Sequence, residues 1–217
     1  MKIRRIRLIV ALVLLMAVTL ATGLLVGRTP PAGTGWGSAE PDVRAVMWPE
    51  PLPLADVELE TQHGAPFTRS DLEGQWSLMF FGYLQCPDVC PTSLSAMREM
   101  RQLLAQRDGN DDLQYYFVSV DPINDDPAEM VDYLAGFDPG FIGLHGPKQQ
   151  IRSLADSMAV KFERFENDSG YVSIDHTSSV MMIDPSGRMV GALPPPLVPE
   201  QMVRRYLDLR NYLENAP

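Results

Sequence analysis

Residues 77–94 read S-L-M-F-F-G-Y-L-Q-C-P-D-V-C-P-T-S-L. The apolar and aromatic run predicts a buried β-strand over residues 76–83. Apolar side chains at helical spacing after the second cysteine predict a helix over about 91–107. Cys86 and Cys90, the only two cysteines of the chain, fall in the loop between them. The sequence therefore predicts either two sulfur ligands for a metal or a redox pair where a strand ends and a helix begins.

A proline follows each cysteine and restricts its backbone. Because the residue before a proline disfavours α geometry, we expect Cys86 and Cys90 to lie in a tight loop. Pro91 would take the first helical position, where its missing N–H costs little, with Cys90 at or near the N-cap. The partial positive charge of the helix N-terminus would favour a Cys90 thiolate, an effect that Asp88 opposes.

The spacing of the two cysteines points to chemistry rather than architecture. A disulfide between residues four apart closes a very small loop and would stabilise the fold little. Cys86 and Cys90 are therefore interpreted as metal ligands or as a dithiol that forms a redox disulfide. Two inert, buried cysteines are the less favoured alternative.

The N-terminus is basic and then strongly apolar. The segment from Leu8 to Val26 carries no charge, and it is flanked by basic residues on both sides. Its length is typical of a membrane span, and basic flanking residues place the N-terminus in the cytoplasm. We predict that residues 1–28 form a single transmembrane helix in a bacterial inner membrane, with the soluble part in the periplasm. A cleaved signal peptide is the alternative.

Beyond the anchor, residues 29–53 are rich in Pro, Gly and Ala and predict a tether. A domain is expected over residues 54–217. Its further buried strands are predicted over 113–120 and 178–184, alternating with helices, while 161–175 is expected to form a hairpin or excursion. This alternation predicts an α/β fold with a layered sheet.

The charge balance excludes one class of partner. The chain has 18 Lys and Arg against 28 Asp and Glu, a net charge of −10. Five of the basic residues flank the apolar N-terminal run, so the remainder is still more acidic. Nucleic-acid binding needs clustered Lys and Arg, and we therefore expect none. An acidic body suits a basic partner protein, or simple solubility.

His176 stands in a polar segment just before the predicted strand 178–184. If that strand runs antiparallel to strand 76–83, its first residues lie at the sheet edge that carries Cys86 and Cys90. His176 would then lie close to both thiols. Two thiolates and one imidazole make a soft, three-coordinate set that favours copper, because structural zinc usually takes four ligands. The other two histidines are expected to be ordinary surface groups.

Three aspartates are candidates for a supporting role. Asp121 and Asp125 follow the predicted strand 113–120 at the same sheet edge, where they could orient the site or contact a partner. Helix capping and turn formation are an equal alternative for both. Asp175 adjoins His176 and could support it as a hydrogen-bonding neighbour, or simply be solvated.

Three motifs in this order resemble the SCO/SenC family of copper proteins: G-Y-L-Q-C-P-D-V-C-P at 82–91, V-D-P-I-N-D at 120–125 and D-H-T at 175–177. The resemblance spans about residues 54–214, and family members commonly carry an N-terminal membrane anchor. It implies a thioredoxin-like fold with an inserted hairpin.

The resemblance also implies a function. Copper, as Cu(I) or Cu(II), would be bound by Cys86, Cys90 and His176. A membrane-anchored metallochaperone, rather than an enzyme, would deliver it to the dinuclear copper centre of cytochrome c oxidase. Its partner would be the oxidase's copper-site subunit or another copper protein, and Asp121 would serve the metal site or partner contact. The alternative is a thiol–disulfide oxidoreductase that reduces the cysteines of a copper-receiving partner, and it would not need His176.

The sequence departs from the family pattern at two places. Gln85 precedes the first cysteine, where many members have His or another residue. Ile123-Asn124 replaces the Glu-Arg of the family's acidic stretch. Neither change removes a ligand, and both bear on which partner is recognised.

Overall fold

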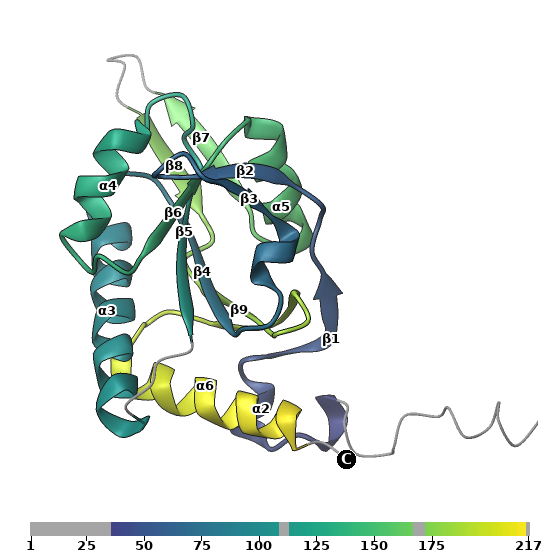
Figure 1. The fold of residues 1–217 in the computed structure, drawn as a ribbon. Helices are drawn as coiled ribbons and strands as arrows, with labels where there is room; N and C mark the ends of the chain where they lie inside the picture. The colour runs from purple at the N-terminus through teal and green to yellow at the C-terminus, as the bar shows by residue number, and fades with distance from the viewer. Residues whose placement is uncertain (1–35, 109–112, 167–171, 216–217) are drawn as a thin grey trace, which may run out of the picture.

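The computed structural model describes residues 36–108, 113–166 and 172–215 (Figure 1). Eight strands form a mixed sheet in the order β1-β10-β9-β4-β5-β6-β2-β3, and β7 and β8 form a separate two-stranded sheet. The strands are β1 (Met47–Pro53), β2 (Glu58–Thr61), β3 (Pro66–Thr68), β4 (Ser77–Gly82), β5 (Gln114–Ser119), β6 (Ile142–His145), β7 (Phe162–Glu166), β8 (Val172–His176), β9 (Val180–Ile183) and β10 (Arg188–Leu193). The helices are η1 (Trp36–Ser38), α2 (Pro41–Arg44), η2 (Arg69–Leu72), α3 (Val89–Asp108), α4 (Pro127–Ala135), α5 (Lys148–Ser157) and α6 (Pro199–Glu214).

The centre of the sheet is the parallel pair β4–β5. The two strands pair in register from Ser77 opposite Gln114 to Gly82 opposite Ser119. Every residue of β4 is buried, which requires consecutive apolar residues rather than the alternation of a half-exposed strand. Because parallel strands end at the same edge, the loops after β4 and β5 lie side by side.

Helices α2 and α6 lie at the end of the molecule opposite to these loops. α6 and α2 lie together across the lower end of the molecule in Figure 1, and α3 packs against α6. The loops after β4 and β5 and the β7–β8 pair lie at the opposite, upper end. The first described residues and the cysteine loop therefore lie at opposite ends of the molecule.

Most predicted elements are confirmed. The predicted strands 76–83, 113–120 and 178–184 correspond to β4, β5 and β9, and β9 runs antiparallel to β4 as expected. Within 161–175 the chain forms the antiparallel pair β7–β8, in which Phe162 lies opposite His176. The α/β sheet expected from the alternation of strands and helices is therefore present.

The predicted tether differs from the structure. Residues 36–53 are folded: η1 and α2 lead into β1, which pairs with β10 at the sheet edge. Val43, Val46 and Met47 are buried there. The prolines that suggested a tether are compatible with β1 because an edge strand tolerates residues that lack an N–H. The folded domain therefore starts well before residue 54.

The predicted anchor, residues 1–28, lies outside the described residues. Within residues 36–108, 113–166 and 172–215, none of the helices has the length and apolar character needed to cross a membrane.

Candidate metal centre

The helix after the cysteine loop begins earlier than predicted. α3 starts at Val89, so Cys90 and Pro91 lie within its first turn. Cys90, expected at or near the N-cap, is the second residue of the helix, so the proline after it does not hold it in the loop. A proline in the first turn removes only an N–H that has no intrahelical acceptor. The Thr92 N–H donates to the Asp88 carbonyl oxygen at 3.2 Å and so stabilises the first turn of the helix.

Cys90 is fully buried against the end of β4. A Cβ on Gly82 would lie 2.8 Å from the Cys90 Sγ and 2.8 Å from the Phe117 ring, so glycine at this position makes room for the sulfur. Burial raises the pKa of the Cys90 thiol, which is opposite to the stabilised thiolate expected at a helix N-terminus. In the metal-free protein Cys90 is therefore held as a thiol.

Cys86 is the more accessible of the two sulfurs. It lies in the loop before α3, is half-buried, and accepts a hydrogen bond from the Cys90 backbone N–H at 3.4 Å. The first turn of the helix thus directs its free N–H at Cys86 rather than at Cys90. The two cysteines are not joined by a disulfide.

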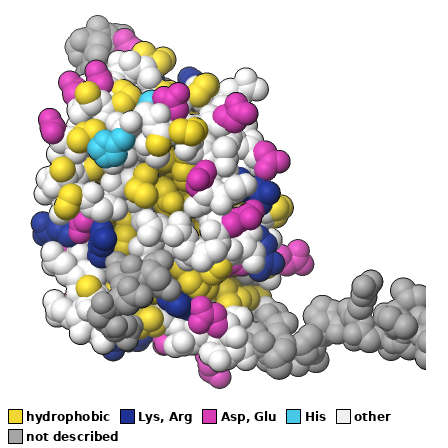
Figure 2. All heavy atoms as spheres, in the orientation of Figure 1, with side chains coloured by type: hydrophobic (Ala, Val, Ile, Leu, Met, Phe, Trp, Pro, Cys, Tyr) yellow, Lys and Arg dark blue, Asp and Glu magenta, His cyan; other side chains and the backbone are white. Residues whose placement is uncertain are grey.

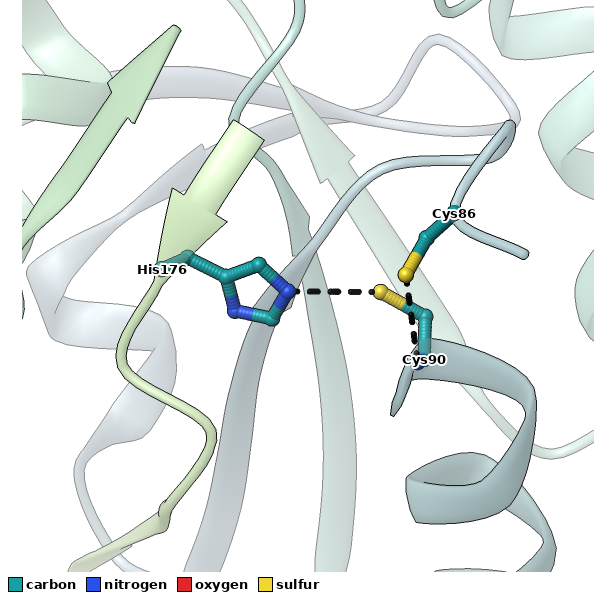
Figure 3. A group of neighbouring side chains, drawn as sticks. All are labelled: Cys86, Cys90 and His176. Carbon is teal, nitrogen blue, oxygen red and sulfur yellow. Dashed lines mark hydrogen bonds between the residues drawn. The ribbon is translucent and has the colours of Figure 1, made fainter. Parts of the chain in front are cut away.

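His176 ends β8 and faces the cysteines from the opposite side (Figure 3). Its Nε2 lies 3.5 Å from the Cys90 Sγ, and its Nδ1 lies 3.1 Å from the Thr177 carbonyl oxygen. A carbonyl only accepts, so the proton is assigned to Nδ1 and the lone pair of Nε2 points at the sulfurs. This arrangement prepares Nε2 to bind a metal.

The three side chains form a compact set of potential ligands. Their ligand atoms all lie within 4.8 Å of one another, and in the described part of the chain this is the one cluster of at least three His, Cys, Asp or Glu side chains suited to a metal. The predicted juxtaposition of Cys86, Cys90 and His176 is therefore present in the structure. The three ligand atoms come from three separate segments: the loop after β4, the first turn of α3 and the end of β8.

Aromatic side chains enclose the histidine. Phe80 and Tyr83 place their rings edge-on to His176, with centroids 5.7 and 6.2 Å away. Burial lowers the pKa of His176, so the imidazole is neutral and able to coordinate at neutral pH. The sequence analysis missed these two residues as parts of the site. Their position at the end of β4, just before the cysteine loop, is the signal that could have found them.

A pocket borders His176. It has a volume of about 630 Å³ and is also lined by Arg152, Lys161, Phe162, Glu163, Asp175 and Thr177. Neither cysteine lines this pocket, so it borders the histidine and not the sulfurs.

Asp125 is buried and connects the cysteine loop to the loop after β5. It accepts hydrogen bonds from the Leu84 backbone N–H at 3.1 Å and from the Ser119 hydroxyl at 2.6 Å. Burial raises its pKa to about 6. Asp125 therefore positions the loop that carries Cys86, while the neighbouring Asp126 caps α4 through the Ala128 N–H.

The other two aspartates take different positions. Asp121 is buried in the loop after β5, where its carboxylate accepts from the Asn124 side-chain amide at 2.7 Å. Asp175 is exposed, and it projects from the opposite face of β8 to His176 because neighbouring residues in a strand alternate. The hydrogen bond to the His176 ring comes from the Thr177 carbonyl instead.

The remaining histidines lie away from this cluster. His145 ends β6, where its Nε2 lies 3.2 Å from the Thr61 carbonyl oxygen. His63 sits in the turn between β2 and β3. Neither belongs to the group of potential metal ligands.

Comparison with known proteins agrees with this geometry. The family model described as SCO1/SenC matches residues 54–211 of this chain. The chain belongs to the SCO1/SenC family. The matched region holds the cysteine loop, the loop after β5 and the hairpin with His176, so the family assignment covers all three parts of the candidate centre.

Solved SCO structures support the thioredoxin-like fold. ScoI of Bradyrhizobium japonicum, solved with copper bound, superposes with a TM-score of 0.64 at 36% identity, covering 74% of this chain and 99% of that one. Yeast Sco1, also solved with copper bound, gives a TM-score of 0.66 at 28% identity, covering 73% and 88%.

Two sequence relatives carry related descriptions. A protein of Stutzerimonas stutzeri described as copper-binding is 32% identical over 154 residues, covering 70% of this chain and 74% of that protein. An SCO2-like protein of Rickettsia felis is 38% identical over 136 residues, covering 61% of this chain and 65% of the relative. The alignment thus spans about two thirds of the Rickettsia protein.

Proposed function

We propose that this protein is a copper metallochaperone that binds one copper ion through Cys86, Cys90 and His176 and delivers it to the dinuclear copper centre of cytochrome c oxidase. One observation carries the proposal. Three soft ligand atoms from three separate segments lie within 4.8 Å of one another, with the imidazole already presenting Nε2.

The ligand set selects the metal. Thiolates favour Cu(I), and imidazole suits copper in both of its common oxidation states. A structural zinc site would require a fourth ligand, and the described residues provide only three in this cluster. Copper bound to two SCO relatives of at least 28% identity gives independent support.

The chain's own residues prepare both binding and release. Gly82 and the core hold Cys90 in place, Asp125 holds the cysteine loop, and Thr177 holds the imidazole tautomer. Cys86 is half-buried, so an incoming acceptor has access to one of the sulfur ligands. A site that is held in place yet accessible suits a protein that must pass its metal on.

The delivery role implies a location. We propose that residues 1–28 anchor the chain in a bacterial inner membrane and that the domain faces the periplasm. Support comes from the uncharged run between basic flanks. Labelling of engineered cysteines on either side of the membrane would test this topology.

The test of copper binding is an anaerobic Cu(I) titration of the reduced protein alongside His176→Ala. We expect one copper per chain in the wild type and clearly weaker binding in the variant. Tight binding unaffected by the substitution would remove His176 from the site. Absence of copper binding would reject the chaperone.

A second function is favoured by one observation. Cys86 is accessible and accepts the Cys90 N–H, as an attacking thiolate would, while Cys90 lies behind it as a resolving thiol. Cys86 would attack a partner disulfide and form a mixed disulfide with the partner. Cys90 would then attack the Cys86 sulfur of this mixed disulfide. A Cys86–Cys90 disulfide forms as the partner leaves with two thiols. Retained disulfide reduction by His176→Ala, without copper binding in the wild type, would favour this oxidoreductase.

A further inference from the structure

Exposed large hydrophobic side chains are few among the described residues; one adjoins Cys90, and another lies in the loop after β5, which is hydrogen-bonded to the cysteine loop. Among the described residues, four large hydrophobic side chains are substantially exposed: Trp36 42%, Val89 42%, Ile123 79% and Phe165 47%. Val89 immediately precedes Cys90, and Ile123 lies in the loop after β5. A single exposed apolar residue needs no explanation, but apolar residues gathered around a functional site point to a contact surface.

The two loops form one surface. The Val120 N–H donates to the Gly82 carbonyl at 2.8 Å, and the Leu84 N–H donates to Asp125 at 3.1 Å. Three further apolar side chains on these loops are exposed or half-buried. We call the following five residues the apolar rim: Leu84, Pro87, Val89, Pro122 and Ile123.

The other two exposed hydrophobic residues are placed differently. Phe165 lies on the face of the β7–β8 pair opposite to that of His176, since residues alternate along the strand and Phe162 pairs with His176. Trp36 lies in η1, beside α2 at the far end of the molecule, with the Arg44 guanidinium 5.5 Å from its ring centroid. Trp36 therefore provides a matched control for Val89.

The two segments that carry the apolar rim are acidic. Residues 83–97 and 120–137 contain no Lys or Arg, while Asp88, Asp126 and Glu129 are exposed within them. Figure 2 shows acidic side chains spread over the upper part of the visible face, in keeping with the net charge of −10. Helix stabilisation explains Asp126 and Glu129 at the start of α4. It does not explain why both segments lack cations or why Ile123 is exposed.

We propose that the apolar rim and its acidic border are the docking surface for a copper-accepting protein whose own thiol ligands lie on an apolar patch bordered by Lys and Arg. The proposal rests on the proposed copper delivery and adds the surface that recognises the acceptor. Opposite charges would speed the encounter, and the apolar contact would exclude water at the centre of the complex.

Copper transfer requires such a contact. The Cu–S bond to the acceptor forms as the Cu–S bond to Cys86 breaks, so both sulfurs must approach one copper ion at a bonding distance. Copper stays Cu(I), and Cys86 takes up the proton that the acceptor thiol releases. Because Cys86 lies within the apolar rim, the acceptor must cover Val89 and its neighbours to reach the metal.

The experiment compares two acceptors. The copper-loaded full chain is mixed anaerobically with the reduced, copper-free soluble domain of the oxidase copper-site subunit from the same organism. In parallel it is mixed with a small-molecule Cu(I) chelator, which needs no docking surface. For Val89→Ser/Ile123→Ser we expect transfer to the protein acceptor to slow by about tenfold or more, since tenfold corresponds to about 1.4 kcal/mol. Transfer to the chelator and copper stoichiometry should stay at wild-type values.

Two further variants isolate the causes. Trp36→Ser removes an equally exposed hydrophobic side chain at the far end and should transfer copper at the wild-type rate. Asp88→Lys/Glu129→Lys should slow transfer to the protein acceptor. Added salt should slow transfer from the wild type but not from this variant.

Each outcome has a distinct meaning. Equal rates for Val89→Ser/Ile123→Ser and Trp36→Ser would overturn the docking surface and leave copper delivery intact. Transfer from the wild type to the chelator but not to the protein acceptor would overturn the delivery function. In that case, NMR of the full chain with the same acceptor domain tests the docking surface. Chemical-shift changes centred on the apolar rim would support the docking surface, whereas changes elsewhere or none would reject it.

Discussion

The loop between β4 and α3 lies against the centre of the main sheet, whereas the β7–β8 pair that carries His176 is a separate two-stranded sheet. Cys90 is fully buried beside Gly82, and the cysteine loop is tied to the loop after β5 through Asp125. His176 is held mainly by its bond to Thr177 and by the rings of Phe80 and Tyr83. The two proposed sulfur ligands are thus positioned by the core, and the proposed nitrogen ligand by a peripheral element.

This difference assigns different tasks to the ligands. Sulfurs held by the core retain their geometry when copper leaves, so they define the site. A histidine on a peripheral pair can shift at lower cost in structure than a core-held sulfur, and it can adjust while the acceptor thiol replaces Cys86 on the copper. Substitutions at the sulfurs, at the histidine and in the core beneath them separate the two tasks.

Replacing a sulfur ligand should have the strongest effect on copper. Cys90→Ser keeps the size of the buried side chain but removes the soft ligand, so Cu(I) affinity should fall by more than about a hundredfold. Competition titration with a Cu(I) chelator measures the change. The same titration on Ser93→Ala, a helix position three residues further on, should match the wild type. An affinity for Cys90→Ser within a fewfold of the wild type would contradict a core-held sulfur site.

Replacing the histidine should have a smaller effect. His176→Ala leaves both sulfurs in place, and we expect Cu(I) affinity to fall by roughly tenfold to a hundredfold. The free energy of unfolding should change by less than about 1 kcal/mol, because the side chain is only partly buried on a peripheral strand. Chelator competition and urea unfolding test the two values. A large loss of stability would show that the hairpin belongs to the cooperative core.

Filling the space beside Cys90 should destabilise the core side of the site. Gly82→Ala adds a methyl group that would lie 2.8 Å from the Cys90 Sγ and the Phe117 ring, and overpacking of this kind costs about 1–3 kcal/mol. Urea unfolding of the metal-free protein measures the loss. Gly37→Ala, where a Cβ would meet nothing within 4 Å, is the matched control and should be neutral. Equal stability of both variants would contradict the close approach.

The pH dependence of stability should report on Asp125. Its pKa is raised to about 6 in the folded protein, so the folded state holds this proton more tightly than the unfolded state. Stability is therefore lost as pH rises from about 4 to 6. Asp125→Asn should lack this part of the pH dependence, and the wild type should lose stability relative to the variant across that interval. Unfolding curves at several pH values measure the difference, and parallel pH profiles would contradict the raised pKa.

The sequence predicted the core of this fold because that part depends on local patterns. A short apolar, aromatic run that ends in a proline-containing loop favours a strand buried on both faces, and the antiparallel β9 then brings His176 to the cysteines. The prediction failed where contacts between distant parts of the chain determine the structure. Residues 36–53 read as a tether because their pairing with β10 involves residues more than a hundred positions away.

The chemistry of individual groups was less predictable for the same reason. The helix N-terminus suggested a Cys90 thiolate, but the tight packing of Cys90 against Gly82 outweighs the helix dipole and favours the thiol. Asp175 was a candidate partner of His176 from adjacency in sequence. Strand alternation separates the two, and a backbone carbonyl takes the role instead. The first outcome depends on the packing of Cys90 in the folded core, and the second on residues 172–176 forming a strand.

X-ray absorption spectroscopy of the Cu(I)-loaded protein reports the ligands of the copper itself. We expect a copper surrounded by two sulfur atoms and one nitrogen atom, with the nitrogen lost in His176→Ala and one sulfur lost in Cys90→Ser. A copper bound by two sulfurs alone in the wild type, or a spectrum unchanged by either substitution, would contradict a centre built from Cys86, Cys90 and His176.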